Sequence, residues 1–235
     1  MTRRVTAFPW YDSPWLATYV DARAWIARHH PARLAGFEER LAPLRTDPAF
    51  EIRQIAQVFD AATLQKIRET IRGLKPDQLQ LNEFRDFGRF VAHDLPYFSE
   101  LQHQLVETVS EAAGESVEPC YNVLALYTKL GVCDIHMDAP EAKWTLDVCI
   151  DQSMGWPIHF SPILPWPEDA SPQGRDWREA IKRDARHRFT AYTPAPGEGL
   201  LFSGSSQWHY RDPLPRAEGG GHFCNLLFLS FREIR

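Results

Sequence analysis

Two residues with metal-binding side chains, His136 and Asp138, lie on either side of Met137. On an extended strand, side chains two positions apart project from the same face, so this imidazole and this carboxylate would point the same way. Both groups coordinate divalent transition metals. In a chain with nine histidines, one such pair has roughly even odds of arising from composition alone. The pair therefore predicts part of a metal site only if the surrounding sequence supports it.

The residues around the pair and a later segment supply that support. Tyr127 and Gly131 precede His136, and towards the C-terminus the apolar run 199–202 is followed, after a short turn, by His209. This arrangement resembles the prolyl-hydroxylase-like members of the Fe(II)/2-oxoglutarate-dependent dioxygenase superfamily. By length and element order, the resemblance extends over roughly three quarters of the chain.

The resemblance implies a metal centre and a cosubstrate. His136, Asp138 and His209 would bind Fe(II), and Tyr127 would donate a hydrogen bond to 2-oxoglutarate. Two histidines and one carboxylate leave open positions on the metal, which lets Fe(II) bind a bidentate oxoacid and then O2. Zinc prefers a closed tetrahedral site, which these three residues do not supply.

The sequence departs from the family at the residue that pairs with the far carboxylate of 2-oxoglutarate. The family places an Arg or Lys at the start of its closing strand, where this chain has His222. We expect Arg211 to take that role, because it follows His209 by two positions and a guanidinium pairs well with a carboxylate. Lys129 is a second candidate and His222 a third. The alternative is a structural salt bridge from Arg211 to Asp212 or to a neighbouring acid at the rim of the barrel.

The implied reaction is oxidation of a C–H bond, coupled to decarboxylation of the oxoacid to succinate and CO2. The carboxylate of Asp138 favours hydroxylation or a related oxidation over halogenation, because related halogenases have a small residue at that position. The substrate would be a small molecule or a peptide. Two other readings stay open: a cupin-like metalloenzyme that uses no oxoacid, and a catalytically inert jelly-roll binding module.

Helical patterns come first along the chain and strand patterns later. Apolar spacing predicts two helices within residues 15–44, a strand within residues 50–58, a helix between Asp60 and Gly73, and a helix at residues 98–113. Short β-rich runs follow, at residues 121–129, 145–151, 199–202, 207–211 and 223–231. This order predicts an α+β fold with helices packed outside the sheets. The resemblance implies that the sheets form a double-stranded β-helix, or jelly roll.

The predicted domain organisation has two parts. Residues 1–48 form an N-terminal helical extension, and residues 49–235 form the oxygenase-like domain. Within that domain, residues 161–188 are rich in proline and then in charge, which predicts an insertion that borders the site entrance as a lid or substrate loop. A plain solvated loop is the alternative.

Composition narrows the class of protein further. The chain of 235 residues has a formal charge of -5 and no basic stripe, so nothing points to nucleic acid. It contains no apolar run long enough for a membrane span or a signal-peptide core, which predicts a soluble, cytoplasmic protein. Its four cysteines are widely spaced, and we expect them to be free thiols.

Overall fold

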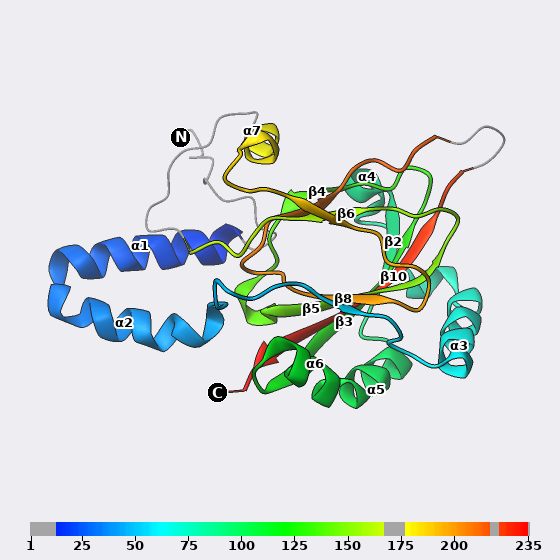
Figure 1. Ribbon diagram of the computed structural model, residues 1–235, viewed down its shortest axis with the longest axis horizontal. Helices are drawn as coiled ribbons and strands as arrows, with labels where there is room; N and C mark the ends of the chain where they lie inside the picture. The colour runs from blue at the N-terminus through cyan, green and yellow to red at the C-terminus, as the bar shows by residue number, and fades with distance from the viewer. Residues whose placement is uncertain (1–12, 167–176, 217–220, 235) are drawn as a thin grey trace.

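The computed structural model describes residues 13–166, 177–216 and 221–234, whose strands form two antiparallel sheets that face each other (Figure 1). The larger sheet has the order β1-β8-β5-β10-β3-β2, from β1 (Arg53–Ile55), β2 (Arg89–His93), β3 (Val117–Tyr127), β5 (Trp144–Gln152), β8 (Gly199–Ser203) and β10 (Cys224–Glu233). The smaller has the order β4-β9-β6-β7, from β4 (Cys133–His136), β6 (Ile158–Phe160), β7 (Thr190–Tyr192) and β9 (His209–Arg211). This is the predicted double-stranded β-helix within an α+β fold.

The outer face of the larger sheet packs against helices. Every second residue of β10 points outward, with Leu227, Leu229 and Phe231 fully buried. They pack in one apolar cluster with residues of α3 (Ala61–Arg72), α5 (Pro96–Gln104) and α6 (Val106–Ala113), which lie along this face (Figure 1). The intervening positions of β10 face the smaller sheet. Period-two alternation thus assigns one face of the strand to the core and the other to the space between the sheets.

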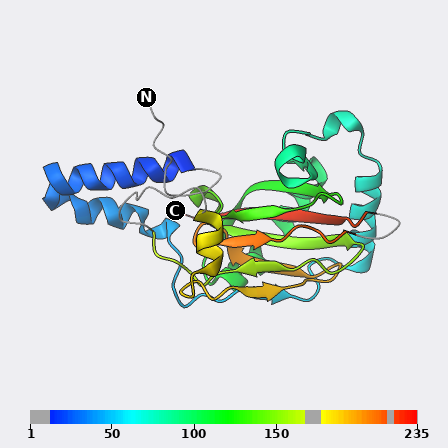
Figure 2. The ribbon, with the colours of Figure 1, turned by 90° about the horizontal axis from the view of Figure 1, so that it is seen from above.

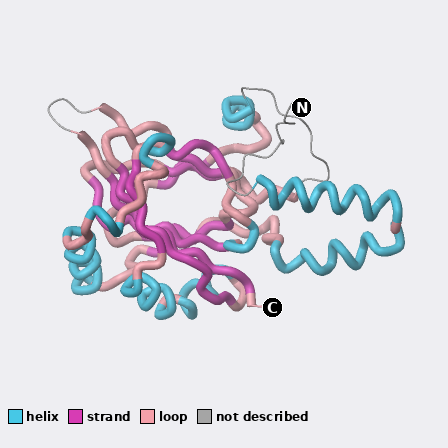
Figure 3. The backbone as a smooth tube through the Cα atoms, turned by 180° about the vertical axis from the view of Figure 1, so that it is seen from behind, coloured by secondary structure: helices cyan, strands magenta, loops and turns pink. Residues whose placement is uncertain are grey.

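The outer face of the smaller sheet is covered by the N-terminal helices and the insertion. Helices α1 (Ser13–His29) and α2 (Leu34–Leu41) form an antiparallel pair that projects from the strands (Figures 2 and 3). Their buried Tyr19 and Val20 pack in one cluster with Ile135 and Met137, and Ile181 of α7 (Trp177–Arg183) joins them. Strands β4 and β9 of the smaller sheet are therefore buried on both faces.

Polar contacts also join the N-terminal segment to the strands. Lys143 Nζ donates to the carbonyl of Pro43 at 3.0 Å, and the hydroxyls of Thr46 and Ser203 are 2.6 Å apart. Both hydroxyl-bearing residues are buried. The division into an extension and a core domain at residue 48 stays a prediction, while these contacts tie the two segments together.

Most predicted elements are present, with several differences in detail. Asp60 caps α3 by accepting a hydrogen bond from the Thr63 backbone at 2.7 Å, as its position predicts. The helix expected at residues 98–113 is two helices, because the chain bends at Leu105, and both lie on β3. The short strands β2, β6 and β7 escaped prediction. All four cysteines are free thiols, and within the described residues no helix is both long and apolar enough to cross a bilayer.

The described parts of the insertion lie away from the site. Residues 167–176 lie outside the described part of the chain. The described remainder packs on the outer face of the smaller sheet, where Ile181 contacts the apolar cluster and Arg178 pairs with Asp134 at 3.4 Å. This face points away from His136, so these residues do not border the site as expected. Helix α7 lies on this face because its apolar Ile181 is buried against the apolar outer surface of β4.

Candidate metal centre

Strand pairing brings the three predicted ligands together. His136 of β4 is directly opposite His209 of β9 in the antiparallel register, and their ring centroids are 4.2 Å apart. Asp138 follows β4 by two residues and projects from the same face as His136. The alternate residues Ile135 and Met137 are buried on the opposite face. Burial of that second face holds the strand in the register that turns both ligands inward.

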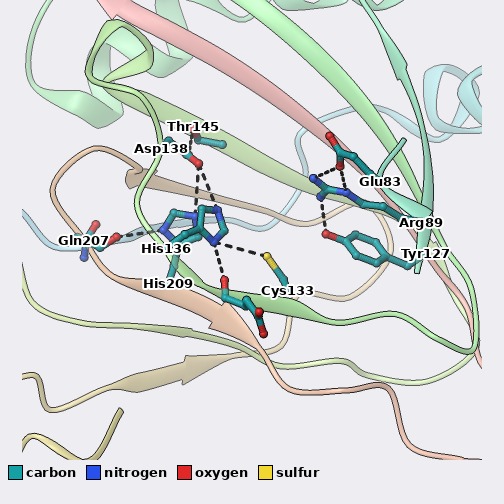
Figure 4. A network of polar contacts seen from close by, with 10 residues as sticks. Glu83, Arg89, Tyr127, Cys133, His136, Asp138, Thr145, Gln207 and His209 are labelled. Carbon is teal, nitrogen blue, oxygen red and sulfur yellow. Dashed lines mark hydrogen bonds and ion pairs between the residues drawn. The ribbon is translucent and has the colours of Figure 1, made fainter. Parts of the chain in front are cut away.

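The ligand atoms converge on one point (Figure 4). Nε2 of His136 is 3.5 Å and Nε2 of His209 is 3.6 Å from Oδ1 of Asp138. One ligand atom from each residue lies within 4.8 Å of the other two. The arrangement therefore offers two imidazole nitrogens and one carboxylate oxygen to a single ion.

The far nitrogen of each imidazole is held by a backbone carbonyl. Nδ1 of His136 is 2.7 Å from the carbonyl oxygen of Asp134, and Nδ1 of His209 is 3.0 Å from that of Gln207. A proton on Nδ1 leaves the Nε2 lone pair for a metal, which is how ligating histidines are commonly oriented. This donor set, with both rings aimed inward, fits Fe(II).

The charges at the centre also suit a cation. Burial opposes ionisation of Asp138, but the adjacent His209 and His136 hold the pKa of its carboxyl far below the usual range, so it stays anionic. Burial lowers the pKa of His209, which favours its neutral, ligating form. Burial would also lower the pKa of His136, but Cys133 and Asp138 raise it to about 10. Metal binding would therefore displace a proton from His136 and tighten as pH rises.

Thr145 and the turn at Gly204 hold Asp138 in position. Thr145 donates its hydroxyl to Oδ2 of Asp138 at 3.0 Å, and the Asp138 amide donates to the Gly204 carbonyl at 2.8 Å. A Cβ atom at position 204 would lie 2.7 Å from Cγ of Asp138, so any larger residue there would have to displace the carboxylate or the turn. Sequence reasoning missed both supports, because each depends on how the chain folds back onto Asp138, from β5 for Thr145 and from the turn after β8 for Gly204.

A cavity of about 460 Å³ lies between the sheets and opens onto the triad. Both sheets contribute to its wall, which combines apolar, aromatic and charged side chains. Besides the triad, its lining includes Glu83, Arg89, His93, Asp94, Tyr121, Val123, Tyr127, Cys133, Thr145, Ile158, Phe202, Arg211, Phe228 and Ser230. None of the described residues of the insertion is among them.

Arg211 reaches the cavity wall but already has partners. It donates to Oδ2 of Asp147 at 2.7 Å and to the carbonyl of Trp156 at 2.5 Å. The side chains of Arg211 and Asp147 are 2% and 0% exposed, so this is a fully buried ion pair. Burial raises the pKa of Asp147, while the Arg211 guanidinium opposes that rise. Arg211 thus has a structural ion pair, but its partner is the buried Asp147 and not Asp212 or another acid at the rim.

Tyr127 also lines the cavity, beside an arginine that sequence reasoning missed. Arg89 donates to the Tyr127 hydroxyl at 2.5 Å and to Oε2 of Glu83 at 2.5 Å (Figure 4). Arg89 lies on β2, directly opposite Tyr127 in the register. The only available signal was a single basic residue before a short apolar run, which is too weak to predict an edge strand.

The other two predicted cosubstrate residues lie outside the cavity wall. Lys129 is exposed and approaches the backbone of Gly221. His222 lies near the surface, with its Nδ1 3.1 Å from the Ser153 hydroxyl. Both lie in or beside the connections that follow β3 and precede β10. The structure therefore brings Tyr127 and Arg211 to the triad's cavity and leaves Lys129 and His222 outside it.

Comparisons with known proteins identify the fold. No family model and no curated protein sequence matches the chain. Solved structures match most of it, among them the α-ketoglutarate-dependent epimerase SnoN from nogalamycin biosynthesis, at 14% identity and a TM-score of 0.59, with 85% of this chain and 84% of that one covered. A Pseudomonas putida prolyl-4-hydroxylase matches at 13% identity and a TM-score of 0.54, covering 84% of this chain and 97% of that one.

A third match extends the same pattern. HygX from Streptomyces hygroscopicus, with nickel and 2-oxoglutarate bound, matches at 12% identity and a TM-score of 0.54, with 77% and 82% of the two chains covered. At these identities, the likeness shows the fold. The chain has the double-stranded β-helix of the Fe(II)/2-oxoglutarate oxygenases, and it carries a His-x-Asp…His triad in that fold.

Proposed function

We propose that this protein is a non-haem Fe(II)- and 2-oxoglutarate-dependent oxygenase that oxidises a C–H bond of a small organic substrate. The observation that carries the proposal is the convergence of His136, Asp138 and His209 on the wall of a cavity. Fe(II) held by these residues, with an oxoacid and O2, would supply the oxidising power. The match to HygX, whose structure holds nickel and 2-oxoglutarate, supports this choice of cosubstrate.

The chain's own residues would orient the reactants and exclude water. The backbone carbonyls of Asp134 and Gln207 fix both imidazoles, and Thr145 orients the carboxylate. Apolar groups of the wall would keep water from the reacting C–H bond; they are Ile158, Phe202 and Phe228. The buried guanidiniums of the same wall would favour an anionic cosubstrate, and Arg211 remains one candidate for that contact.

The size of the cavity supports a small-molecule substrate. Its volume of about 460 Å³ is within the range of small-ligand sites, roughly 300 to 1,000 Å³. The side chains of His93, Asp94, Tyr121 and Ser230 line the part of the wall formed by the far end of β2 and by β3 and β10. These polar groups would receive a substrate with hydroxyl or amine functions.

Two observations weigh against the other readings. Cavity-lining arginines beside the triad favour a site for an anionic oxoacid over a cupin-like enzyme that uses none. An inert jelly-roll module would have no reason to hold both Nδ1 atoms against carbonyls while the Nε2 atoms face a carboxylate. The oxygenase accounts for both features.

Replacing one ligand and one nearby control residue tests the proposal. Asp138→Ala should abolish Fe(II)-dependent formation of succinate and weaken metal binding, since it removes the anionic ligand of the triad. Asp134→Ala removes a carboxylate that is 53% exposed, and it should retain both properties. Circular dichroism would verify that each variant is folded. Normal oxoacid turnover by Asp138→Ala would contradict the metal assignment, and the absence of succinate from the wild-type protein across a metabolite library would contradict the oxygenase.

A further inference from the structure

Two arginines of the cavity lie at the ends of a row of aromatic rings. The Arg89 guanidinium carbon lies 5.2 Å from the Tyr127 ring centroid, Tyr127 meets Trp156 edge to face at 4.8 Å, and Arg211 lies 5.0 Å from the Trp156 ring centroid. Both guanidiniums are close enough to Tyr127 to influence its phenol. Either one is placed to bind an anion in the cavity, but their existing partners differ.

Arg211 forms an ion pair that a ligand in the cavity does not replace. Its ion pair with Asp147 joins β9 to β5, and both side chains are almost completely shielded from solvent. Asp147 is not part of the cavity wall, so a ligand cannot replace it from the cavity side. Separating this pair would leave a buried charge without compensation, which is strongly unfavourable. The positive charge of Arg211 is therefore balanced within the protein.

Arg89 is held by a partner that a ligand can replace. Its carboxylate partner, Glu83, is part of the cavity wall, and the Glu83 side chain is 21% exposed. Glu83 precedes α4 (Phe84–Phe87) and belongs to no strand, so its side chain can rotate towards solvent without breaking a sheet. The carboxylate group of Glu83 thus occupies a site that binds carboxylates and is accessible from the cavity.

Tyr127 completes that site. Arg89 donates to the phenol oxygen, which leaves the phenol's own proton to be donated to a second acceptor. Burial raises the pKa of Tyr127, although Arg89 opposes this, so the phenol keeps its proton. A guanidinium and a phenol hydroxyl side by side present two kinds of donor to one carboxylate.

We propose that Arg89 and Tyr127 bind the distal carboxylate of the oxoacid, and that Glu83 is an internal competitor which that carboxylate displaces. This inference rests on the proposed function and names the anchor for its cosubstrate. The exchange replaces one carboxylate with another, so the charge around Arg89 is unchanged. It also makes the site selective for oxoacids with a second carboxylate. The apparent affinity for such an oxoacid is lower than the intrinsic affinity, because only molecules in which Glu83 has left the site can bind it.

Equilibrium binding to Ni(II)-loaded protein without oxygen tests the inference independently of turnover. Titration calorimetry with 2-oxoglutarate should show binding weakened roughly 10 to 100-fold in Arg89→Gln and tightened in Glu83→Gln. The monocarboxylate 2-oxobutyrate, which lacks the distal group, should bind equally to both variants and to the wild-type protein. Arg85→Gln is the matched control, because the Arg85 side chain is 93% exposed on the neighbouring helix, and it should bind both oxoacids as the wild type does.

Each remaining outcome would contradict a specific part of the inference. Unchanged 2-oxoglutarate affinity in Arg89→Gln would overturn the anchor, and unchanged affinity in Glu83→Gln would overturn the competition. A loss confined to a folded Arg211→Gln variant would transfer the anchor to Arg211. Arg89→Lys, which retains the charge, provides a second variant if Arg89→Gln does not fold, and partial retention of binding is expected. If Ni(II)-loaded wild-type protein binds neither oxoacid, the proposed function itself fails.

Discussion

Gly204 lies directly behind the carboxylate of Asp138, and a Cβ atom at that position would be 2.7 Å from Cγ and closer still to Oδ2. The turn between β8 and β9 therefore sets the position of a carboxylate that follows β4. Because the contact is between backbone and a ligand side chain, the turn has no flexible group that can make room.

Gly204→Ala should weaken metal binding by about 10-fold or more, because either Asp138 or the turn must move to admit the methyl group. Co(II) titration followed by absorption would measure the change. The matched control is Gly36→Ala within α2, where an added Cβ meets nothing within 4 Å. That variant should keep its metal affinity and gain roughly 0.5 to 1 kcal/mol of stability, as a helical Gly-to-Ala change does. Equal metal affinities of Gly204→Ala and the wild type would show that the turn does not position the ligand.

Thr145→Val should reduce metal affinity roughly 10 to 100-fold with little effect on folding, since it keeps the side-chain shape and removes the donor to Oδ2 of Asp138. Metal titration and thermal unfolding of the same preparation would separate the two effects. Thr70→Val on α3 removes a hydroxyl that only contacts the Lys66 carbonyl, so its metal affinity should be normal. A similar affinity for both valine variants would assign Thr145 a packing role.

Arg211→Met should lower the free energy of unfolding by about 3 to 5 kcal/mol, because Asp147 is left buried and unpaired. Urea unfolding would measure the loss. This loss of stability should shrink as pH falls. Burial raises the pKa of Asp147 in the folded state, so the folded protein binds the proton more tightly than the unfolded chain does. Protonation then removes the buried, unpaired charge. Adding Asp147→Leu should recover most of the stability. A single variant as stable as the wild type would show that the pair is solvated.

Val20→Ala should lower the free energy of unfolding by about 1 to 3 kcal/mol, because Val20 is 4% exposed and packs in the cluster with Ile135 and Met137. Chemical denaturation would measure it. Trp25→Ala on the same helix removes a side chain that is 55% exposed, and its effect should remain within about 0.5 kcal/mol. If Val20→Ala were equally neutral, the N-terminal helices would not be docked on the strands that carry His136 and His209.

The sequence was sufficient to predict features that depend on local spacing. The same-face relation of His136 and Asp138 follows from strand periodicity, and the cap at Asp60 follows from side-chain chemistry within one turn. His209 was predicted through family resemblance, since nothing local marks it as the partner of a residue on another strand. The closing strand was visible as a long apolar run.

The missed features depend on contacts between distant segments. Arg89 joins the cavity because a five-residue edge strand pairs with β3, and the strand is too short to show a period. Arg211 lies on the cavity wall, but its partner Asp147 lies 64 positions away along the chain and could not be predicted from local spacing. The role of Gly204 likewise depends on a loop packing against a residue from another strand.

The burial of β4 and β9 on both faces limits how this protein can be altered. Between Cys133 and Asp138, inward side chains form the cavity and the triad, while Ile135 and Met137 support the N-terminal helices. A mutational scan of this segment should therefore find few tolerant positions. Exposed positions of β1 and β7 should vary freely by comparison. Efforts to change what the cavity binds should leave β4 and β9 unaltered and introduce substitutions on the β2, β3 and β10 side of the cavity.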